Sequence, residues 1–392
     1  MTWRHCVLVC LAVGCGGDGG GTEGSGSPGS SSGAEAGESS GGSSGATPTS
    51  GGEGTTAATV DPTTGEPVGE PFTITVLDRQ WITGTGGWDT QHKDVEVDLT
   101  AGKFEKVLLT IDLESSCYPF EKWDSDPPPQ GHNWPAKCDA FDRTMGFIFD
   151  PAAADGDPPG FEALRSITPF GGPQHAEADI TDWANMHPGV HSLRSYIDSW
   201  PDGAGQVSGS EGGWTLSVKL DVVPGTPPKN VVAAISLYQG GVGSDVGQTA
   251  LPFTLPPETT SAVIEYRVSG HGGANDPSGD CIGPAEEFCK RTHHLFLDAE
   301  ELQAFQPWRT DCSEFCTIMQ TPMFGNYCGE NPCGSIQSVN APRAQWCPGD
   351  VVKPLKGPVG IGPGEHTLGF LVDGLFPGGT WTTSLVVYGY AD

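Results

Sequence analysis

From Pro71 onward the sequence is a series of short runs in which apolar and polar residues alternate, separated by turns rich in proline and glycine. This period of two places successive side chains on opposite faces of a β-strand, and many short strands of this kind are typical of β-sandwiches. No run has the period of a convincing amphipathic helix, although residues 299–305 fit a short one. The chain is therefore predicted to be all-β. The predicted strands are residues 72–76, 95–99, 106–113, 146–149, 163–167, 193–197, 214–223, 231–237, 262–268, 294–297, 366–372 and 381–388.

The strongest interruption among these runs is Pro-Gly-Thr-Pro-Pro at residues 224–228. Clustered proline and glycine mark a connection rather than a strand. The folded part is therefore predicted to divide near residue 226 into two sandwiches, 71–226 and 227–392. Each is long enough to have a hydrophobic core of its own.

The first fifteen residues have the pattern of an export signal. Arg4 and His5 form a short basic region, and the apolar stretch 6–13 is too short to span a bilayer. Ala-Val-Gly-Cys at 12–15 resembles the lipobox of bacterial lipoproteins, in which the cysteine is diacylated, and the following Gly16 favours the outer membrane. A lipid anchor on Cys15 at the bacterial cell surface is expected. The alternative is an ordinary secretory signal cut nearby, which would also export the chain.

Residues 16–70 are predicted to be a disordered tether, because about two thirds of them are Gly, Ser or Thr, eight are acidic and none is Lys or Arg. Without those acids and Arg4, the folded part has 41 acids and 18 bases, a net charge of −23. Such a surface repels phosphate backbones and anionic headgroups, so nucleic acid is not an expected partner. A monomer is expected, and the membrane is reached only through the lipid.

Nine cysteines follow Cys15, and an exported chain is expected to pair them as disulfides. Cys281 and Cys289 would close a short rigid loop, and Cys117 and Cys138 a longer one. Clustered cysteines also suit zinc, but no Cys-x-x-Cys pair occurs, so disulfides are favoured. Five cysteines remain, which leaves one over: Cys312, Cys316, Cys328, Cys333 and Cys347.

The stretch most suggestive of chemistry is Cys-Asp-Ala-Phe-Asp-Arg at residues 138–143, which leads into the apolar run 145–149. It places two carboxylates and an arginine at the start of a predicted strand. Asp142 is the first candidate for a catalytic acid. Taken alone, Asp142 and Arg143 fit a structural ion pair better than a catalytic role, and Glu287 taken alone fits a solvated loop acid better.

Residues 138–143 resemble the Cys-Asp-Glu-Trp-Asp-Arg motif of the peptide-N-glycosidase F family. Ile-Thr-Pro-Phe at 167–170 and Asp-Ile-Thr-Asp-Trp at 179–183 resemble the family's Ile-Thr-Pro-Tyr and Asp-Val-Thr-Asp-Phe. Further similar motifs follow in the same order: Tyr-Ile-Asp-Ser-Trp at 196–200, Glu-Phe-Cys-Lys-Arg-Thr-His at 287–293 and Pro-Arg-Ala-Gln-Trp-Cys-Pro-Gly at 342–349. The resemblance covers the chain from about residue 72 to the C-terminus, and it is the ordered set that makes it specific.

This resemblance implies two antiparallel jelly-roll domains packed side by side, with the site in the cleft between them. It also implies hydrolysis of the amide that joins asparagine to the first N-acetylglucosamine of N-linked glycoproteins or glycopeptides. The glycan would leave as a glycosylamine, and the asparagine would become aspartate. By similarity, Asp142 is the catalytic acid, Glu287 is its partner from the other domain, and Asp198 is a third carboxylate.

Amide hydrolysis suits such residues, because a carboxylate pair can take a proton from water and return one to the departing nitrogen. Arg143 and Arg343 could hold one carboxylate ionised and stabilise charge on the carbonyl oxygen. No metal and no cofactor is expected. Three aromatic side chains could offer flat faces to sugar rings, although such rings are equally often core: Trp200, Phe288 and Trp346.

The sequence departs from the family pattern at several positions. Asp198 is one methylene shorter than the family's glutamate, and a displacement of about 1 Å at a reacting centre can cost on the order of a hundredfold in rate. His271 stands where the family has tryptophan, so one wall that contacts sugar is expected to differ. Phe288 also replaces a tryptophan, and the loop 117–138 is longer than its counterpart, which could alter the choice of glycan.

Two other classes of function compete with this interpretation. A glycan-binding jelly-roll protein without catalysis is one, but binding alone requires no carboxylate pair. A copper monooxygenase of related architecture is the other, but no His-x-His pair occurs, and His293 and His294 would point to opposite faces of a strand.

Overall fold

The computed structural model describes residues 59–60, 67–154, 156–273, 281–322 and 325–392. The predicted signal, 1–15, lies outside these residues, as does most of the predicted tether, 16–70. Within the tether, Thr59–Val60 (β1) pairs with Pro67–Val68 (β2). Among the described residues, no helix is both long enough and apolar enough to cross a membrane.

The first sandwich consists of two four-stranded antiparallel sheets. Its strands alternate as the sequence predicts: in Gly213–Pro224 (β10) every second side chain from Trp214 to Val222 is buried. One sheet has the order β3 (Phe72–Thr83), β10, β5 (Phe104–Ser115) and β8 (Gln174–Asp179). The other has the order β4 (His92–Asp98), β9 (Val190–Ile197), β6 (Thr144–Phe149) and β7 (Phe161–Ile167). Two short helices, α1 (Trp88–Gln91) and α2 (Thr181–Met186), connect strands.

The second sandwich repeats this plan with two further antiparallel sheets. One has the order β11 (Val231–Val242), β20 (Thr380–Tyr390), β13 (Ser261–His271) and β18 (Leu355–Val359). The other has the order β12 (Leu251–Leu255), β19 (Gly364–Val372), β14 (His293–Leu297) and β15 (Glu300–Phe305). The first sandwich ends at Pro224 and the second begins at Val231, and the exact boundary near residue 226 stays a prediction.

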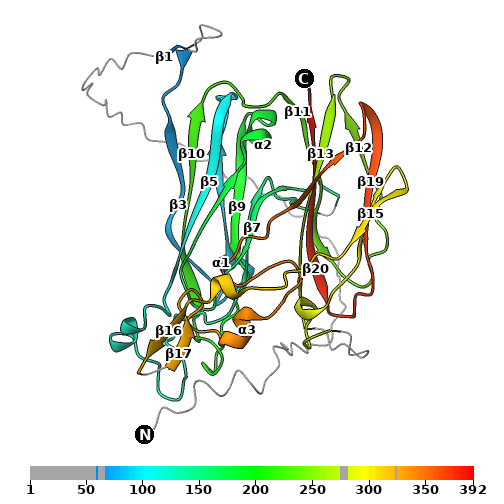
Figure 1. Cartoon of the computed structure of the whole chain (residues 1–392). Coiled ribbons are helices and arrows are strands. Elements are labelled where there is room, and N and C mark those ends of the chain that lie inside the picture. The colour runs from blue at the N-terminus through cyan, green and yellow to red at the C-terminus, as the bar shows by residue number, and fades with distance from the viewer. Residues whose placement is uncertain (1–58, 61–66, 155, 274–280, 323–324) are drawn as a thin grey trace, which may run out of the picture.

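The two sandwiches lie side by side (Figure 1). The core of the first continues into the second, because Ala234, Val386 and Tyr388 of β11 and β20 join its buried cluster. The predicted all-β fold with two antiparallel jelly-roll domains packed side by side is confirmed.

A buried group of charges ties the sandwiches together. The Arg165 guanidinium donates to both oxygens of Glu162, at 2.8 and 2.6 Å, and to the backbone oxygen of Thr382 across the interface at 2.7 Å. Glu162 also accepts from Ser384 Oγ at 2.6 Å, and the Arg267 guanidinium lies 3.9 Å from it. Because the side chains of Arg165 and Glu162 are fully buried, their charges depend on one another.

The segment between β15 and β18 leaves the second sandwich and packs against the first. In Figure 1, β16 (Ile318–Thr321), β17 (Gly325–Cys328) and α3 (Ile336–Asn340) lie at the end of the first sandwich. The Tyr327 ring packs edge-on to Phe120 at 5.3 Å. The segment then covers the edge of β7, where Ile167 N–H donates to Asp350 O at 3.0 Å.

The disulfides hold these loops. The predicted pairs Cys117–Cys138 and Cys281–Cys289 are confirmed. Four of the remaining five cysteines form two more bridges, Cys312–Cys347 and Cys316–Cys328. The fifth, Cys333, has its sulfur within 4.8 Å of both sulfurs of Cys117–Cys138.

The short helix suggested for residues 299–305 is wrong. Glu300–Phe305 is an edge strand that pairs with β14, although its residues are good helix formers. Asp298 and Ala299 between the two strands both have positive φ, 49° and 68°, which is the geometry of a tight two-residue hairpin turn. The tight turn and the pairing with β14 override the local helix propensity.

Candidate active site

Asp142 lies in the connection between Cys138, which is bridged to Cys117, and β6. Its neighbour Arg143 does not pair with it. The Arg143 guanidinium instead donates to Asp139, with Nε 2.9 Å from Oδ2, and to the backbone oxygen of Trp200 at 2.9 Å. The alternative of an Asp142–Arg143 structural ion pair is therefore wrong, and the Asp142 carboxylate is left for another partner.

Asp139 anchors this stretch. Its buried carboxylate accepts from Arg143, from Ser199 Oγ at 2.6 Å and from Trp214 Nε1 at 3.3 Å. Because Asp139 directly follows a bridged cysteine, both its backbone and its side chain are fixed. This support was missed from the sequence, where only the position beside Cys138 pointed to it.

Glu287 comes from the second sandwich, in the turn η3 (Glu286–Phe288) inside the Cys281–Cys289 loop. Arg343 lies between it and Asp142. Its Nη1 is 3.0 Å from Glu287 Oε1, and its Nη2 is 3.9 Å from Asp142 Oδ2. The Arg343 side chain is 1% exposed, so a buried cation joins the two predicted catalytic carboxylates.

The backbone around Arg343 fixes its position. Arg343 and Arg309 exchange backbone hydrogen bonds of 2.9 Å, and Ala344 N–H donates to Glu287 O at 2.8 Å. The guanidinium also donates to the backbone oxygen of Ser338 in α3, at 2.8 Å. Arg343 therefore lies beside Glu287 and Asp142 because the long segment before β18 returns along this path.

Burial raises the pKa of both carboxylates. For Glu287 the loss of solvent is opposed by Arg343 and reinforced by Asp142, and its pKa rises to about 7. The pKa of Asp142 is raised for the same first reason, against the attraction of Arg343 and Arg143. Since Glu287 has the direct ion pair, we assign it as the carboxylate that ionises first, with the proton kept on Asp142.

The predicted aromatic residues form a stack around Arg343. Its guanidinium lies over the rings of Phe288 and Trp346, 4.9 and 4.6 Å from their centroids. Trp346 is 2% exposed, so it supports Arg343 and His271 more than it offers a free face. Trp200 is different: it is 60% exposed and lies beside Arg143 through its backbone oxygen.

His271 lies against the aromatic ring of Trp346. It stacks on Trp346, with centroids 5.3 Å apart and planes 24° apart. Its Nε2 is 2.8 Å from Ser269 Oγ, which also accepts from Arg165 Nη1 at 3.1 Å. Burial, together with Arg165 and Arg343, lowers the pKa of His271 to about 3, so the ring is neutral. That Arg165 and Ser269 reach His271 could not be predicted from the sequence.

Asp198 follows the last residue of β9, and its N–H donates to Thr144 O at 2.9 Å. Loss of solvent raises the pKa of its carboxyl, and Arg143 opposes that shift. In the described part of the chain, Asp198 makes no ion pair with Arg343. The structure therefore brings Asp142, Glu287 and Arg343 together, and places Asp198 on the Arg143 side of the site.

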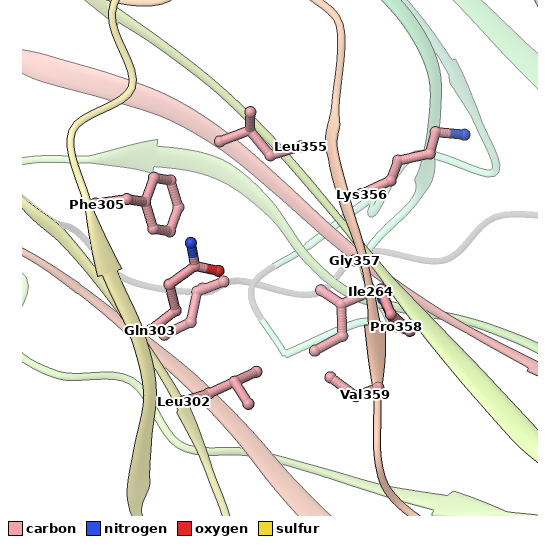
Figure 2. A pocket seen from close by; sticks show the side chains of 10 residues that line it. Ile264, Leu302, Gln303, Phe305, Leu355, Lys356, Gly357, Pro358 and Val359 are labelled. Carbon is pink, nitrogen blue, oxygen red and sulfur yellow. The ribbon is translucent and has the colours of Figure 1, made fainter.

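A cavity of about 340 Å³ lies elsewhere, between the edge strands β15 and β18 of the second sandwich. Figure 2 shows Leu302 and Phe305 on one side and Ile264 and Val359 on the other, with Lys356 pointing away. None of the predicted site residues lines it, and it holds no carboxylate. It is not the candidate active site.

Comparison with known proteins agrees with this geometry. Residues 244–390 match the family model described as peptide-N-glycosidase F, C terminal. A relative from Elizabethkingia miricola, peptide-N(4)-(N-acetyl-beta-D-glucosaminyl)asparagine amidase F, is 27% identical over 232 residues, 55% of this chain and 57% of that protein. The matched region thus spans little more than half of that relative.

Solved structures extend the likeness in fold to the first sandwich. Recombinant peptide:N-glycanase F (PNGase F) has a TM-score of 0.59 at 19% identity, covering 82% of this chain and 96% of that one. PNGF-II has a TM-score of 0.60 at 18% identity, covering 82% and 66%. At these identities the structures support the fold.

The chain has two jelly-roll sandwiches, and each contributes one carboxylate that lies beside the buried Arg343. These features define a class of paired-sandwich protein with an acidic site between its domains. Within that class, the chain is similar to the peptide-N-glycosidase F family. The model of that family's C-terminal part matches residues 244–390, and the relative is similar over 55% of the chain.

Proposed function

We propose that this chain hydrolyses the amide between asparagine and the first N-acetylglucosamine of N-linked glycoproteins or glycopeptides. The observation that carries the proposal is Arg343, which holds Glu287 at 3.0 Å and lies 3.9 Å from Asp142. Similarity to the peptide-N-glycosidase F family over residues 244–390, and to the relative, supports the substrate class.

In the proposed reaction, the Glu287 carboxylate removes a proton from water, whose oxygen attacks the side-chain carbonyl carbon of asparagine. Arg343 stabilises the negative charge on the carbonyl oxygen, because it is already oriented and little solvent surrounds it. The carbon–nitrogen bond then breaks as Asp142 gives its proton to the nitrogen. The products are aspartate in the peptide and a glycosylamine, and every proton is accounted for by the two carboxyls and water.

We further propose that the chain is exported and anchored to the bacterial outer membrane through a lipid on Cys15. The support is the sequence pattern at 4–16 alone. Labelling of cells with a radioactive fatty acid, with Cys15→Ser as the control, tests it. A mature protein without label would leave the ordinary secretory signal.

The proposed activity is tested by incubating the chain with an N-glycopeptide in water labelled with heavy oxygen. Mass spectrometry should find aspartate at the glycosite with one labelled oxygen, and the intact glycan released. A sugar left on the asparagine would mean a different bond is cut. Glycan binding without any release would favour the non-catalytic binding protein.

The pH profile should have a limb set by Glu287. Its raised pKa keeps it protonated below about pH 7, where it cannot act as a base. We therefore expect kcat/KM to rise as the pH increases through about 7, and to fall again where Asp142 loses the proton that it must give to the nitrogen. In Glu287→Gln this limb should vanish along with most of the activity. An unchanged limb in that variant would assign it to another group.

The His271 wall should affect binding more than chemistry. In His271→Ala the imidazole ring that stacks on one face of Trp346 is removed, which exposes that face and takes away a polar group. We expect KM to rise about three- to tenfold with kcat nearly unchanged. His175→Ala, at an exposed position on β8, is the matched control. A fall in kcat at constant KM would instead give His271 a part in the chemical step.

A further inference from the structure

The outer face of the sheet whose strand β9 leads to Asp198 carries a strip of polar and aromatic side chains, most of them half-buried. Along β9, Arg194 and Tyr196 point to the same face, since side chains two residues apart on a strand share a face, and Asp198 follows directly after the strand. The pairing register places His92 of β4 beside Tyr196, and Asp94 beside Arg194. The strip therefore continues from the candidate site along two neighbouring strands.

Trp88 covers this strip. Its ring stacks on His92 at 4.5 Å with planes 23° apart, and lies 6.0 Å from the Tyr196 ring. The Arg194 guanidinium lies 5.7 Å from its centroid. These three partners all belong to the sheet face beneath the indole. Because the residue is nevertheless 48% exposed, we assign the open face of the ring to the solvent side.

The strip is also rigid, which favours binding. Arg194 donates to both oxygens of Asp94, at 2.9 and 2.7 Å, and His92 Nδ1 bonds the Trp88 backbone oxygen at 2.6 Å. The Tyr196 ring lies across Gly146, where a Cβ atom would be 2.4 Å from Tyr196 Cε1. A platform held in this way loses little freedom when a ligand covers it.

The helix that carries Trp88 is fixed to the candidate site. The buried Gln91 side chain, at the end of α1, donates to the backbone oxygen of Ser199 at 2.8 Å. Ser199 lies between Asp198 and Trp200, two of the predicted site residues. Trp88 and the site are therefore parts of one rigid surface.

We propose that Trp88 is a second sugar platform, which binds an outer, neutral sugar of the same glycan whose first sugar occupies the cleft. This inference rests on the proposed function and adds a subsite to it. Two residues of strand span about 7 Å, so the strip from Asp198 to Arg194 extends for about 13 Å, more than the width of one sugar ring.

The chemistry of the strip selects this ligand. An open indole face suits the apolar face of a sugar ring, and the neighbouring guanidinium, imidazole and carboxylate can bond its hydroxyl groups. The folded part carries a net charge of −23, which disfavours acidic sugars and anionic peptides. A neutral branch of the glycan is the ligand that fits both features.

The test compares two glycopeptides with the same peptide, one with a high-mannose glycan and one trimmed to its first two sugars. For Trp88→Ala we expect kcat/KM on the long glycan to fall about three- to tenfold and that on the trimmed one to stay unchanged. Trp88→Phe, which keeps a flat ring, should retain most of the activity. Phe72→Ala, an exposed aromatic residue on the opposite sheet, is the matched control.

Equal losses on both glycopeptides, or none on either, would overturn the platform. If the native chain cuts neither substrate, the proposed function fails. The sugar platform at Trp88 is then tested by glycan binding alone. In that case saturation-transfer NMR with the free high-mannose oligosaccharide should show contact with outer mannose protons for the native chain and not for Trp88→Ala. The same contacts in both proteins would contradict it.

Discussion

Asp142→Asn is expected to lower the rate of amide hydrolysis on the order of 10²- to 10⁴-fold, because the variant cannot return a proton to the departing nitrogen. Asparagine has nearly the same shape as aspartate, so the packing around position 142 should not change. It also removes a carboxyl whose ionisation burial opposes, so the variant should be at least as stable as the native chain. The measurement is kcat on an N-glycopeptide, together with the melting temperature.

The matched control is Asp112→Asn, at an exposed position on β5 of the opposite sheet, which should keep full activity. The double variant Asp142→Asn/Glu287→Gln sharpens the test. If the two carboxylates act as a unit through Arg343, the double variant should be little worse than either single variant. Losses that simply multiply would mean that the two groups act independently, and a fully active Asp142→Asn would remove Asp142 from the mechanism.

The fold class could be predicted from the sequence, because the alternation of apolar and polar residues along a strand is a local signal. In β10 the buried residues occupy every second position, as predicted for a strand between two layers. It failed at β15, where helix-forming residues lie on an exposed edge and the tight turn at Asp298 and Ala299 decides the structure. An edge strand buries little surface, so its sequence contains little pattern to detect.

The candidate site was predictable as a set of residue types and unpredictable as a set of contacts. Asp142, Glu287 and Arg343 come together because three segments far apart in the sequence meet in the cleft. Arg143 was expected to serve the site directly, yet its guanidinium is bound to Asp139 four residues earlier. Such a choice between two neighbouring carboxylates depends on burial, which periodicity does not encode.

The buried charges between the sandwiches should dominate stability. Glu162→Gln keeps the shape of the side chain but leaves the Arg165 and Arg267 guanidinium groups without their shared carboxylate. Removing one partner of a buried pair costs about 3–5 kcal/mol, since the remaining charge has lost its solvent. We expect the melting temperature to fall by roughly 10 °C, measured by calorimetry at neutral pH.

The pH dependence of this loss has a definite sign. Interaction with Arg165 and Arg267 outweighs burial and holds the pKa of Glu162 below its ordinary value. Its ionised form therefore stabilises the native chain at neutral pH, and that contribution disappears as the pH falls through the folded-state pKa. The difference in melting temperature between the native chain and Glu162→Gln should be full near pH 7 and narrow in acid.

Glu265→Gln provides the control, because Glu265 pairs with Lys356, whose side chain is largely exposed. That pair should contribute less than about 1 kcal/mol. A second variant, Glu162→Gln/Arg165→Met, removes both a charge and its partner, and should recover part of the loss if the cost comes from an uncompensated cation. If Glu162→Gln melts like Glu265→Gln, the charges do not hold the two sandwiches together. Stability would then rest on the apolar contacts that Ala234, Val386 and Tyr388 make with the first core.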